Sequence, residues 1–201
     1  METLIEAARR GHSHETAKRT AELEGVPLKL LIDGLADGTL VIPSNSSRRI
    51  QRPVAIGRGV TVKINANIGS SADRESAEDE LEKLRVAVAY GAHTVMDLST
   101  GPEWKSILER ILRSSPVPLG TVPLYQVFGQ AIRDGRDVAD VNVDEIFSAV
   151  EDHCRMGVDY LTLHCGVTAR AVSRSPRSVS TSPGRRRGSP ACCGRPRRAA
   201  G

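Results

Sequence analysis

The chain has 201 residues, of which 39% are apolar and 26% charged, a composition typical of a globular protein that buries a core. It has no run of about 18 apolar residues and no apolar leader, so we expect no membrane span and a cytoplasmic location. The formal net charge of +4 is misleading, because residues 171–201 contribute eight arginines and no acid, which leaves −4 for residues 1–170. The negative charge of the folded part argues against specific nucleic-acid binding by it.

Residues 1–52 predict a small helical cap at the amino terminus. Apolar residues at helical spacing indicate helices within residues 3–24, interrupted near Gly11, and over residues 28–36. A brief strand over residues 40–43 and a polar loop over residues 44–49 follow. We assign no ligand role to the loop residues after Asn45.

From Pro53 the pattern changes to strands that alternate with helices. Strands are predicted over residues 60–68, 94–98, 117–122 and 158–163. Helices are predicted over residues 75–90, 103–113 and 142–157, whereas residues 126–140 look less regular. Along the first strand every second residue is apolar, and the residues between them include Asn65 and Asn67.

Alternating strands and helices indicate an α/β fold with a parallel sheet. The same order of features follows Gly91 and Gly157: a helix end at the glycine, then an apolar strand, then a polar strand tip. The spacing between the two glycines corresponds to two repeats of about 33 residues. The pattern leaves two options open: half of a (β/α)₈ barrel, or a doubly wound sheet. The dinucleotide and P-loop glycine motifs do not follow any predicted strand.

Polar residues follow the predicted strands at their carboxyl ends, where α/β enzymes bind ligands. The stretch from Met96 to Thr100 and the residue His164 are the clearest examples. From the residues alone, a buried strand with a solvated end is the simpler explanation, and a histidine at a strand end needs no ligand.

The composition changes after Val172 to a mixture rich in arginine, serine, proline, glycine and alanine. We expect residues 171–201 to form a disordered basic tail. Such an acid-free mixture is also typical of a GC-rich coding region translated in a shifted frame, which is the explanation we favour. A genuine tail of this kind would bind polyanions without sequence specificity.

Four ordered blocks and part of the cap resemble the phosphomethylpyrimidine synthase family of thiamine biosynthesis. The blocks are KINANIGSS (63–71), YGAHTVMDLSTG (90–101), SSPVPLGTVPLYQ (114–126) and VDYLTLHCGV (158–167), and the cap segment is LADGTLVIPSN (35–45). The resemblance covers residues 1 to about 170. It implies a partial (β/α)₈ TIM-type barrel of about four βα units over residues 53–170.

The resemblance also implies a reaction. The family converts aminoimidazole ribotide into hydroxymethylpyrimidine phosphate by radical chemistry, using S-adenosylmethionine and a [4Fe–4S] cluster. A close relative makes hydroxybenzimidazole for cobamides from the same substrate, and these blocks do not separate the two. Two further functions stay open: a non-catalytic fragment with a polyanion-binding tail, and a metabolite-binding half barrel. A homodimer is possible for the full-length family.

By this resemblance, Asn67, Met96, Tyr125 and His164 match substrate-contacting positions. Asn67 would hydrogen-bond the ribotide, Met96 would pack on its imidazole, and Tyr125 and His164 would bind polar or phosphate groups. Asp97 is expected to be structural.

The family's zinc-binding histidines and its C-x-x-C-x4-C cluster motif lie beyond the matching region. The adjacent pair Cys192–Cys193 cannot replace that motif, because a cluster needs three thiolates that converge on separate irons. We therefore expect no metal site in this chain, and no activity from it alone.

Overall fold

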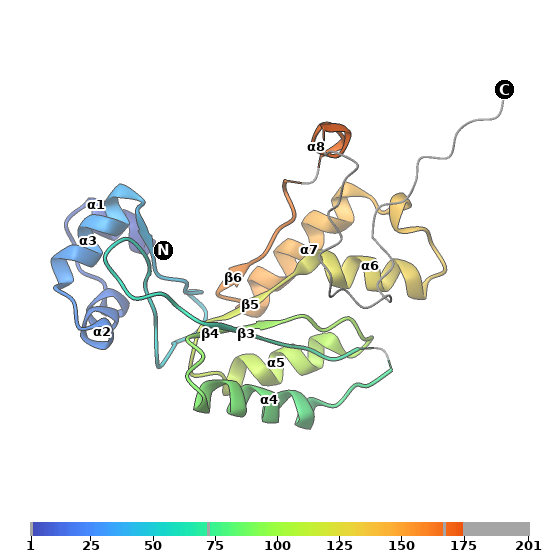
Figure 1. Ribbon diagram of the computed structural model, residues 1–201, viewed down its shortest axis with the longest axis horizontal. Coiled ribbons are helices and arrows are strands. Elements are labelled where there is room, and N and C mark those ends of the chain that lie inside the picture. Colours follow the sequence, from blue (N-terminus) through green and yellow to red (C-terminus); the bar gives the residue numbers. More distant parts are fainter. Residues whose placement is uncertain (1, 72, 167, 175–201) are drawn as a thin grey trace, which may run out of the picture. The chain divides into compact units, whose positions relative to one another are not determined.

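The computed structural model describes residues 2–71, 73–166 and 168–174 (Figure 1). By its internal contacts the chain divides into two units, residues 1–164 and residues 165–201. In the second unit, helix α8 spans Ala169–Arg174, and the backbone N–H of Ala171 donates to Thr168 Oγ1. Most of the tail predicted from residue 171 lies outside the described residues, so its disorder stays a prediction.

The first unit begins with the expected helical cap. Its helices are α1 (Leu4–Arg9), α2 (Glu15–Glu24) and α3 (Leu28–Asp37). They pack around buried Leu31 and Leu35. Strand β1 (Leu40–Val41) pairs antiparallel with β2 (Ile56–Gly57), and Ala55 is fully buried in the same cluster. The packing of the cap thus continues past residue 52; the division of the chain at residues 52 and 170 stays a prediction.

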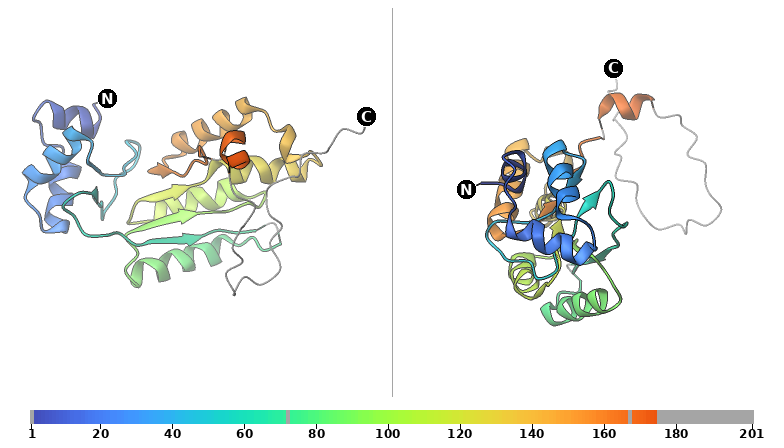
Figure 2. Two further views of the ribbon diagram at one scale, coloured as in Figure 1. Left: turned by 45° about the horizontal axis from the view of Figure 1, so that its top comes forward. Right: turned by 90° about the vertical axis from the view of Figure 1, so that its left-hand side faces the viewer.

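Four parallel strands follow, in the order β3-β4-β5-β6 (Figure 2, left). They are β3 (Asn65–Ile68), β4 (Thr94–Asp97), β5 (Leu119–Thr121) and β6 (Tyr160–Leu161). The connecting helices are α4 (Ala77–Ala89), α5 (Trp104–Ser114), α6 (Pro123–Arg133), the 3₁₀ turn η1 (Val138–Asp140) and α7 (Val143–Met156). The predicted α/β fold with a parallel sheet is confirmed, while the closed barrel stays a proposal.

Helices α4, α5 and α7 pack on the same face of this sheet. Ile68, Val95 and Leu119 from three neighbouring strands form one buried cluster with Leu84 of α4 and Leu108 of α5. His153 of α7 reaches the same face, because its ring contacts the Thr121 hydroxyl and stacks on Trp104. Burying a large aliphatic side chain contributes about 1.5–3 kcal/mol, so this cluster anchors the sheet.

Two predictions about local structure are wrong. The strand predicted over residues 60–68 comprises only Asn65–Ile68, and Val62 and Ile64 are 91% and 60% exposed. Alternation indicates an extended backbone, but a strand also needs a neighbouring backbone to pair with. Residues 126–133, expected to be irregular, belong to α6, which begins with a proline in its first turn. Gly129 obscured the helical pattern; a Cβ there would lie 3.0 Å from the Thr100 carbonyl oxygen.

No helix among the residues that the structure describes has both the length and the apolar character needed to cross a membrane.

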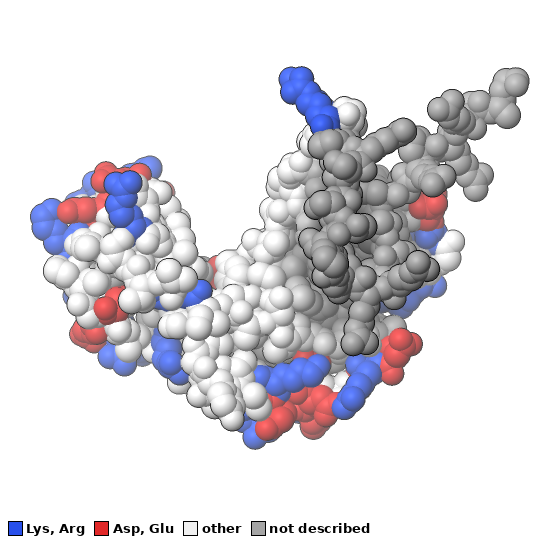
Figure 3. Space-filling view, in the orientation of Figure 1, with Lys and Arg blue, Asp and Glu red and all other residues white. Residues whose placement is uncertain are grey.

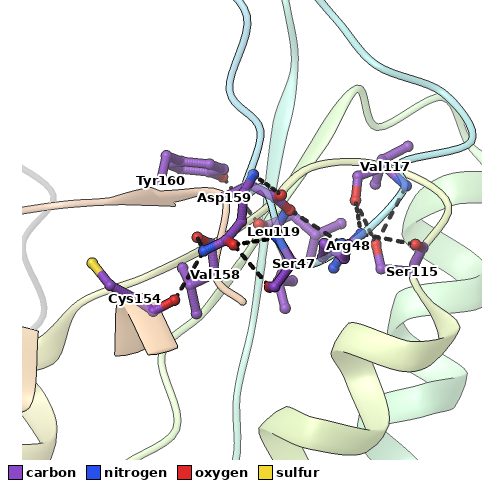
Figure 4. Close-up of polar contacts among 11 residues, drawn as sticks. Ser47, Arg48, Ser115, Val117, Leu119, Cys154, Val158, Asp159 and Tyr160 are labelled. Carbon is purple, nitrogen blue, oxygen red and sulfur yellow. Dashed lines mark hydrogen bonds and ion pairs between the residues drawn. The ribbon is translucent and has the colours of Figure 1, made fainter. Parts of the chain in front are cut away.

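A buried junction fastens the cap loop to the sheet through Asp159 (Figure 4). Asp159 Oδ1 accepts from the Asn45 backbone N–H at 3.0 Å, and Oδ2 accepts from the Leu119 N–H at 2.9 Å. Arg48 Nε lies 3.6 Å from Oδ2, and the Asp159 side chain is fully buried. Burial raises the Asp159 pKa and lowers the Arg48 pKa.

Asn45 and Arg48 also bind main-chain carbonyls. Arg48 Nη2 donates to the Ser115 and Val117 carbonyls at 3.0 and 3.1 Å. Asn45 Nδ2 donates to the Cys154 and Val158 carbonyls at 2.9 and 3.0 Å. The polar loop therefore ties together the segments that lead into β5 and β6.

Asp97 and His153 are ionisable side chains buried on the helix-covered face. Asp97 is fully buried, and its Oδ1 accepts from the Ser99 hydroxyl at 2.6 Å and the Ser99 N–H at 3.1 Å. Burial raises the Asp97 pKa from 3.8 to about 6 despite these bonds. His153 is also fully buried, 2.7 Å from Thr121 Oγ1, and burial lowers its pKa from 6.5 to about 4.

We expect Asp159→Ala to lower the free energy of unfolding by about 3–5 kcal/mol, because it leaves Arg48 buried without a counter-charge and two N–H groups without an acceptor. Urea unfolding measures the loss. The matched control is Asp152→Ala, which breaks a 3.2 Å ion pair with Lys105 between half-exposed side chains and should cost at most about 1 kcal/mol. Equal costs for the two variants would refute the buried junction.

The two buried ionisable groups predict opposite pH dependences. His153 has the lower pKa when folded, so acidification from pH 6.5 to 4 removes its contribution to stability. Asp97 has the higher pKa when folded, so acidification from pH 6 to 3.8 adds stability. Each contribution amounts to about 3 kcal/mol when complete.

Relative to the unsubstituted chain, Asp97→Asn should therefore lose stability more steeply between pH 6 and 4, and His153→Gln less steeply. Urea unfolding at several pH values checks both variants. Parallel curves for all three proteins would contradict the burial of these two groups.

Candidate functional site

The face of the sheet opposite α4 and α5 carries two of the predicted site residues side by side. In the parallel register, Asn67 pairs with Met96, Met96 with Gly120, and Gly120 with Tyr160. Residues paired in this way point to the same face, and their neighbours along each strand point to the other. Asn67 is exposed and Met96 half-buried, near the carboxyl ends of their strands.

The other two predicted residues also lie together. Tyr125 is in the first turn of α6, just beyond β5, and its side chain is 37% exposed. Its ring centroid lies 5.9 Å from that of His164, which is exposed and follows β6. The Thr162 hydroxyl, two residues before His164, lies 3.7 Å from Met96 Sδ and links the two pairs. The structure thus brings all four residues to the carboxyl end of one sheet.

Tyr160 and Thr94, which the sequence patterns did not single out, form a hydrogen-bonded network with Asn65 beside Asn67. The Tyr160 hydroxyl donates to Asn65 Oδ1 at 2.8 Å and contacts the Val95 carbonyl oxygen at 3.0 Å. The Thr94 hydroxyl donates to the same Asn65 oxygen at 3.0 Å, and Asn65 Nδ2 donates to Asn67 Oδ1 at 2.8 Å. The sequence held a signal for Tyr160, because it lies an even number of residues before His164 and so points to the same face of an extended segment.

The predicted site residues and the network beside Asn67 supply amides, hydroxyls, a thioether and an imidazole. The polarity of this face therefore comes mostly from neutral groups. Charged side chains gather elsewhere: Figure 3 shows them over α4 and α5, where Arg85 pairs with Glu82 and Arg110 with Glu78. Burial raises the Tyr160 pKa, so its hydroxyl keeps its proton at neutral pH. Such a set can bind a planar polar ligand through hydrogen bonds and apolar contact.

A groove in the cap lies apart from these residues. It has a volume of about 1410 Å³ and is lined by residues 2–53 of the cap and its loop. A smaller cavity of about 320 Å³ lies beside the carboxyl end of β3 and includes Ser70 and Thr100. Neither of these two hollows is lined by Asn67, Met96, Tyr125 or His164.

The side chains present do not fit an iron–sulfur cluster. Within residues 2–71, 73–166 and 168–174, no three His, Cys, Asp or Glu side chains lie close enough to hold a metal ion. Cys154 and Cys165 are both exposed thiols, and a cluster needs three converging thiolates. Cys192 and Cys193 lie outside the described residues.

Comparisons with known proteins give a consistent result. The model of the Radical SAM ThiC family matches residues 3–183. Phosphomethylpyrimidine synthase of Thermus thermophilus is 45% identical over 88% of this chain, and that of Desulfitobacterium hafniense is 44% identical over 85%. Phosphomethylpyrimidine synthase 2 of Methanothermobacter thermautotrophicus is 42% identical over 88%.

The chain spans 41%, 39% and 41% of the lengths of these three relatives. The family match extends beyond residue 170, where the sequence resemblance was expected to end, but it leaves out residues 184–201. A match over most of the chain, together with identities above 40%, establishes descent. The chain belongs to the Radical SAM ThiC family.

Proposed function

We propose that this chain is the amino-terminal part of a phosphomethylpyrimidine synthase, which converts aminoimidazole ribotide into hydroxymethylpyrimidine phosphate in thiamine biosynthesis. The observation that carries the proposal is the grouping of Asn67, Met96, Tyr125 and His164 at the carboxyl end of one parallel sheet. The names of the relatives favour the pyrimidine product over hydroxybenzimidazole.

In this proposal the chain supplies part of the substrate site. Asn67 hydrogen-bonds the ribotide, Met96 packs on the imidazole ring, and Tyr125 and His164 bind its polar or phosphate groups. The register pairing of Asn67 with Met96 supports a shared ligand, as does the 5.9 Å separation of the Tyr125 and His164 rings.

The sheet is proposed to be half of a (β/α)₈ barrel. The sequential strand order and the common face occupied by α4, α5 and α7 support this arrangement, because a doubly wound sheet has helices on both faces. Strands β3 and β6 are the edges of the described sheet, where further strands would pair.

The family implies S-adenosylmethionine, a [4Fe–4S] cluster that cleaves it to start radical chemistry, and zinc. We propose that the ligands of these groups belong to the part of the relatives that this chain does not match, since the described side chains do not fit them. A cytoplasmic location and a homodimer of the full-length enzyme complete the proposal.

A titration with aminoimidazole ribotide tests the substrate assignment. Binding by the 201-residue chain should weaken about 2- to 10-fold in Asn67→Ala, the loss expected for one hydrogen bond between neutral groups. Gln51→Ala is the control, because it removes an exposed amide from the cap loop and should leave affinity unchanged. Equal affinity for both variants and the unsubstituted chain would exclude Asn67 from the site.

We expect the purified chain alone to make no pyrimidine product. After treatment with iron and sulfide under reducing conditions, its visible spectrum should show no cluster absorbance, because its four cysteines do not form a C-x-x-C-x4-C motif. A stable cluster, or pyrimidine product formed from the ribotide, would disprove this expectation.

A further inference from the structure

We propose that Tyr160, Asn65 and Gly120 position Asn67 so that its amide nitrogen faces the ligand as a hydrogen-bond donor. Asn67 would then bind an acceptor atom of the ligand, such as a ring nitrogen or a ribose or phosphate oxygen, and not an amino group. The inference rests on the proposed function for the ligand itself and adds the direction of the hydrogen bond.

The direction follows from a chain of donors that ends at Asn67. Two hydroxyl groups, from Tyr160 and Thr94, converge on Asn65 Oδ1 at 2.8 and 3.0 Å. With its oxygen occupied, Asn65 directs its amide nitrogen to Asn67 Oδ1 at 2.8 Å. The oxygen of Asn67 is thereby used inside the protein, and its exposed amide nitrogen stays available to a ligand.

The orientation of the Asn65 amide gives both hydroxyl groups an acceptor. Thr94 is 4% exposed, and its hydroxyl donates to Asn65 Oδ1. The Tyr160 hydroxyl donates to the same oxygen and also lies 3.0 Å from the Val95 carbonyl oxygen. An amide nitrogen in that place would accept from neither hydroxyl, so the oxygen is the atom that faces them.

Gly120 allows Tyr160 to take part in this network. The Tyr160 side chain starts on β6 and crosses β5 to reach Asn65 on β3 and the Val95 carbonyl on β4. A Cβ built at Gly120 would lie 2.2 Å from the Tyr160 ring, so any larger residue would displace the ring. Gly120 pairs with both Met96 and Tyr160 in the register. A glycine is needed at this position because the Tyr160 ring occupies the space that a side chain would fill.

The network can be read directly by NMR in the ¹⁵N-labelled chain without ligand. The side-chain NH₂ signals of Asn65 and Asn67 are identified by their loss in Asn65→Ala and Asn67→Ala. We expect slower exchange with water for the Asn65 amide proton that bonds Asn67 Oδ1 than for the amide protons of Asn67. Tyr160→Phe, which keeps the ring and removes only the hydroxyl, should speed the exchange of the Asn65 protons.

A ribotide titration of the same proteins gives the functional consequence. Tyr160→Phe should bind about 2- to 10-fold more weakly, the loss of one hydrogen bond between neutral groups. Tyr90→Phe makes the same chemical change at a residue that is 88% exposed and should alter neither exchange nor affinity.

Protected Asn67 protons, or a Tyr160→Phe variant that matches Tyr90→Phe in both measurements, would overturn the positioning role. Failure of every protein to bind the ribotide would instead count against the proposed substrate site. The exchange data would still determine the amide orientation.

Discussion

The two-residue alternation of side chains along parallel strands is the constraint on which the rest of this structure depends. On one face it places Ile68, Val95 and Leu119 against helices α4 and α5, where burial stabilises the sheet. On the other face it places Asn67, Met96 and Tyr160, joined through Gly120 by the strand register. A shift of one residue in any strand would exchange the two sets, so the same packing that stabilises the sheet also presents the candidate site.

Hydrogen bonds between neutral groups organise the open face. Four of its side chains, Tyr160, Thr94, Asn65 and Asn67, form one continuous donor chain across three strands of the sheet. Such a network holds its members in a single orientation because both amide oxygens already have a donor. Specificity for a polar ligand can therefore come from the direction of an amide.

At the opposite end of the strands, the Asp159 junction serves stability. The loop that contains Asn45 and Arg48 closes hydrogen bonds to segments more than one hundred residues later in the sequence, as in the bonds from Asn45 to Asp159. This matches the usual division in barrel-like folds, where the amino ends of strands support the structure and the carboxyl ends bind ligands. The loop after Asn45, which has no assigned ligand role, has this structural one.

Local periodicity in the sequence was enough to determine most helices, the four parallel strands and the shared parity of Asn65 and Asn67, because helix and strand periods depend only on neighbouring residues. The resemblance of the four blocks added the family and the residues Asn67, Met96, Tyr125 and His164. The tertiary structure alone decided which predicted strand residues have a partner, which is why Val62 is exposed. It also decided that Tyr160 reaches Asn65, 95 positions away, over a glycine. Contacts of this kind depend on strand order and register, which no local pattern encodes.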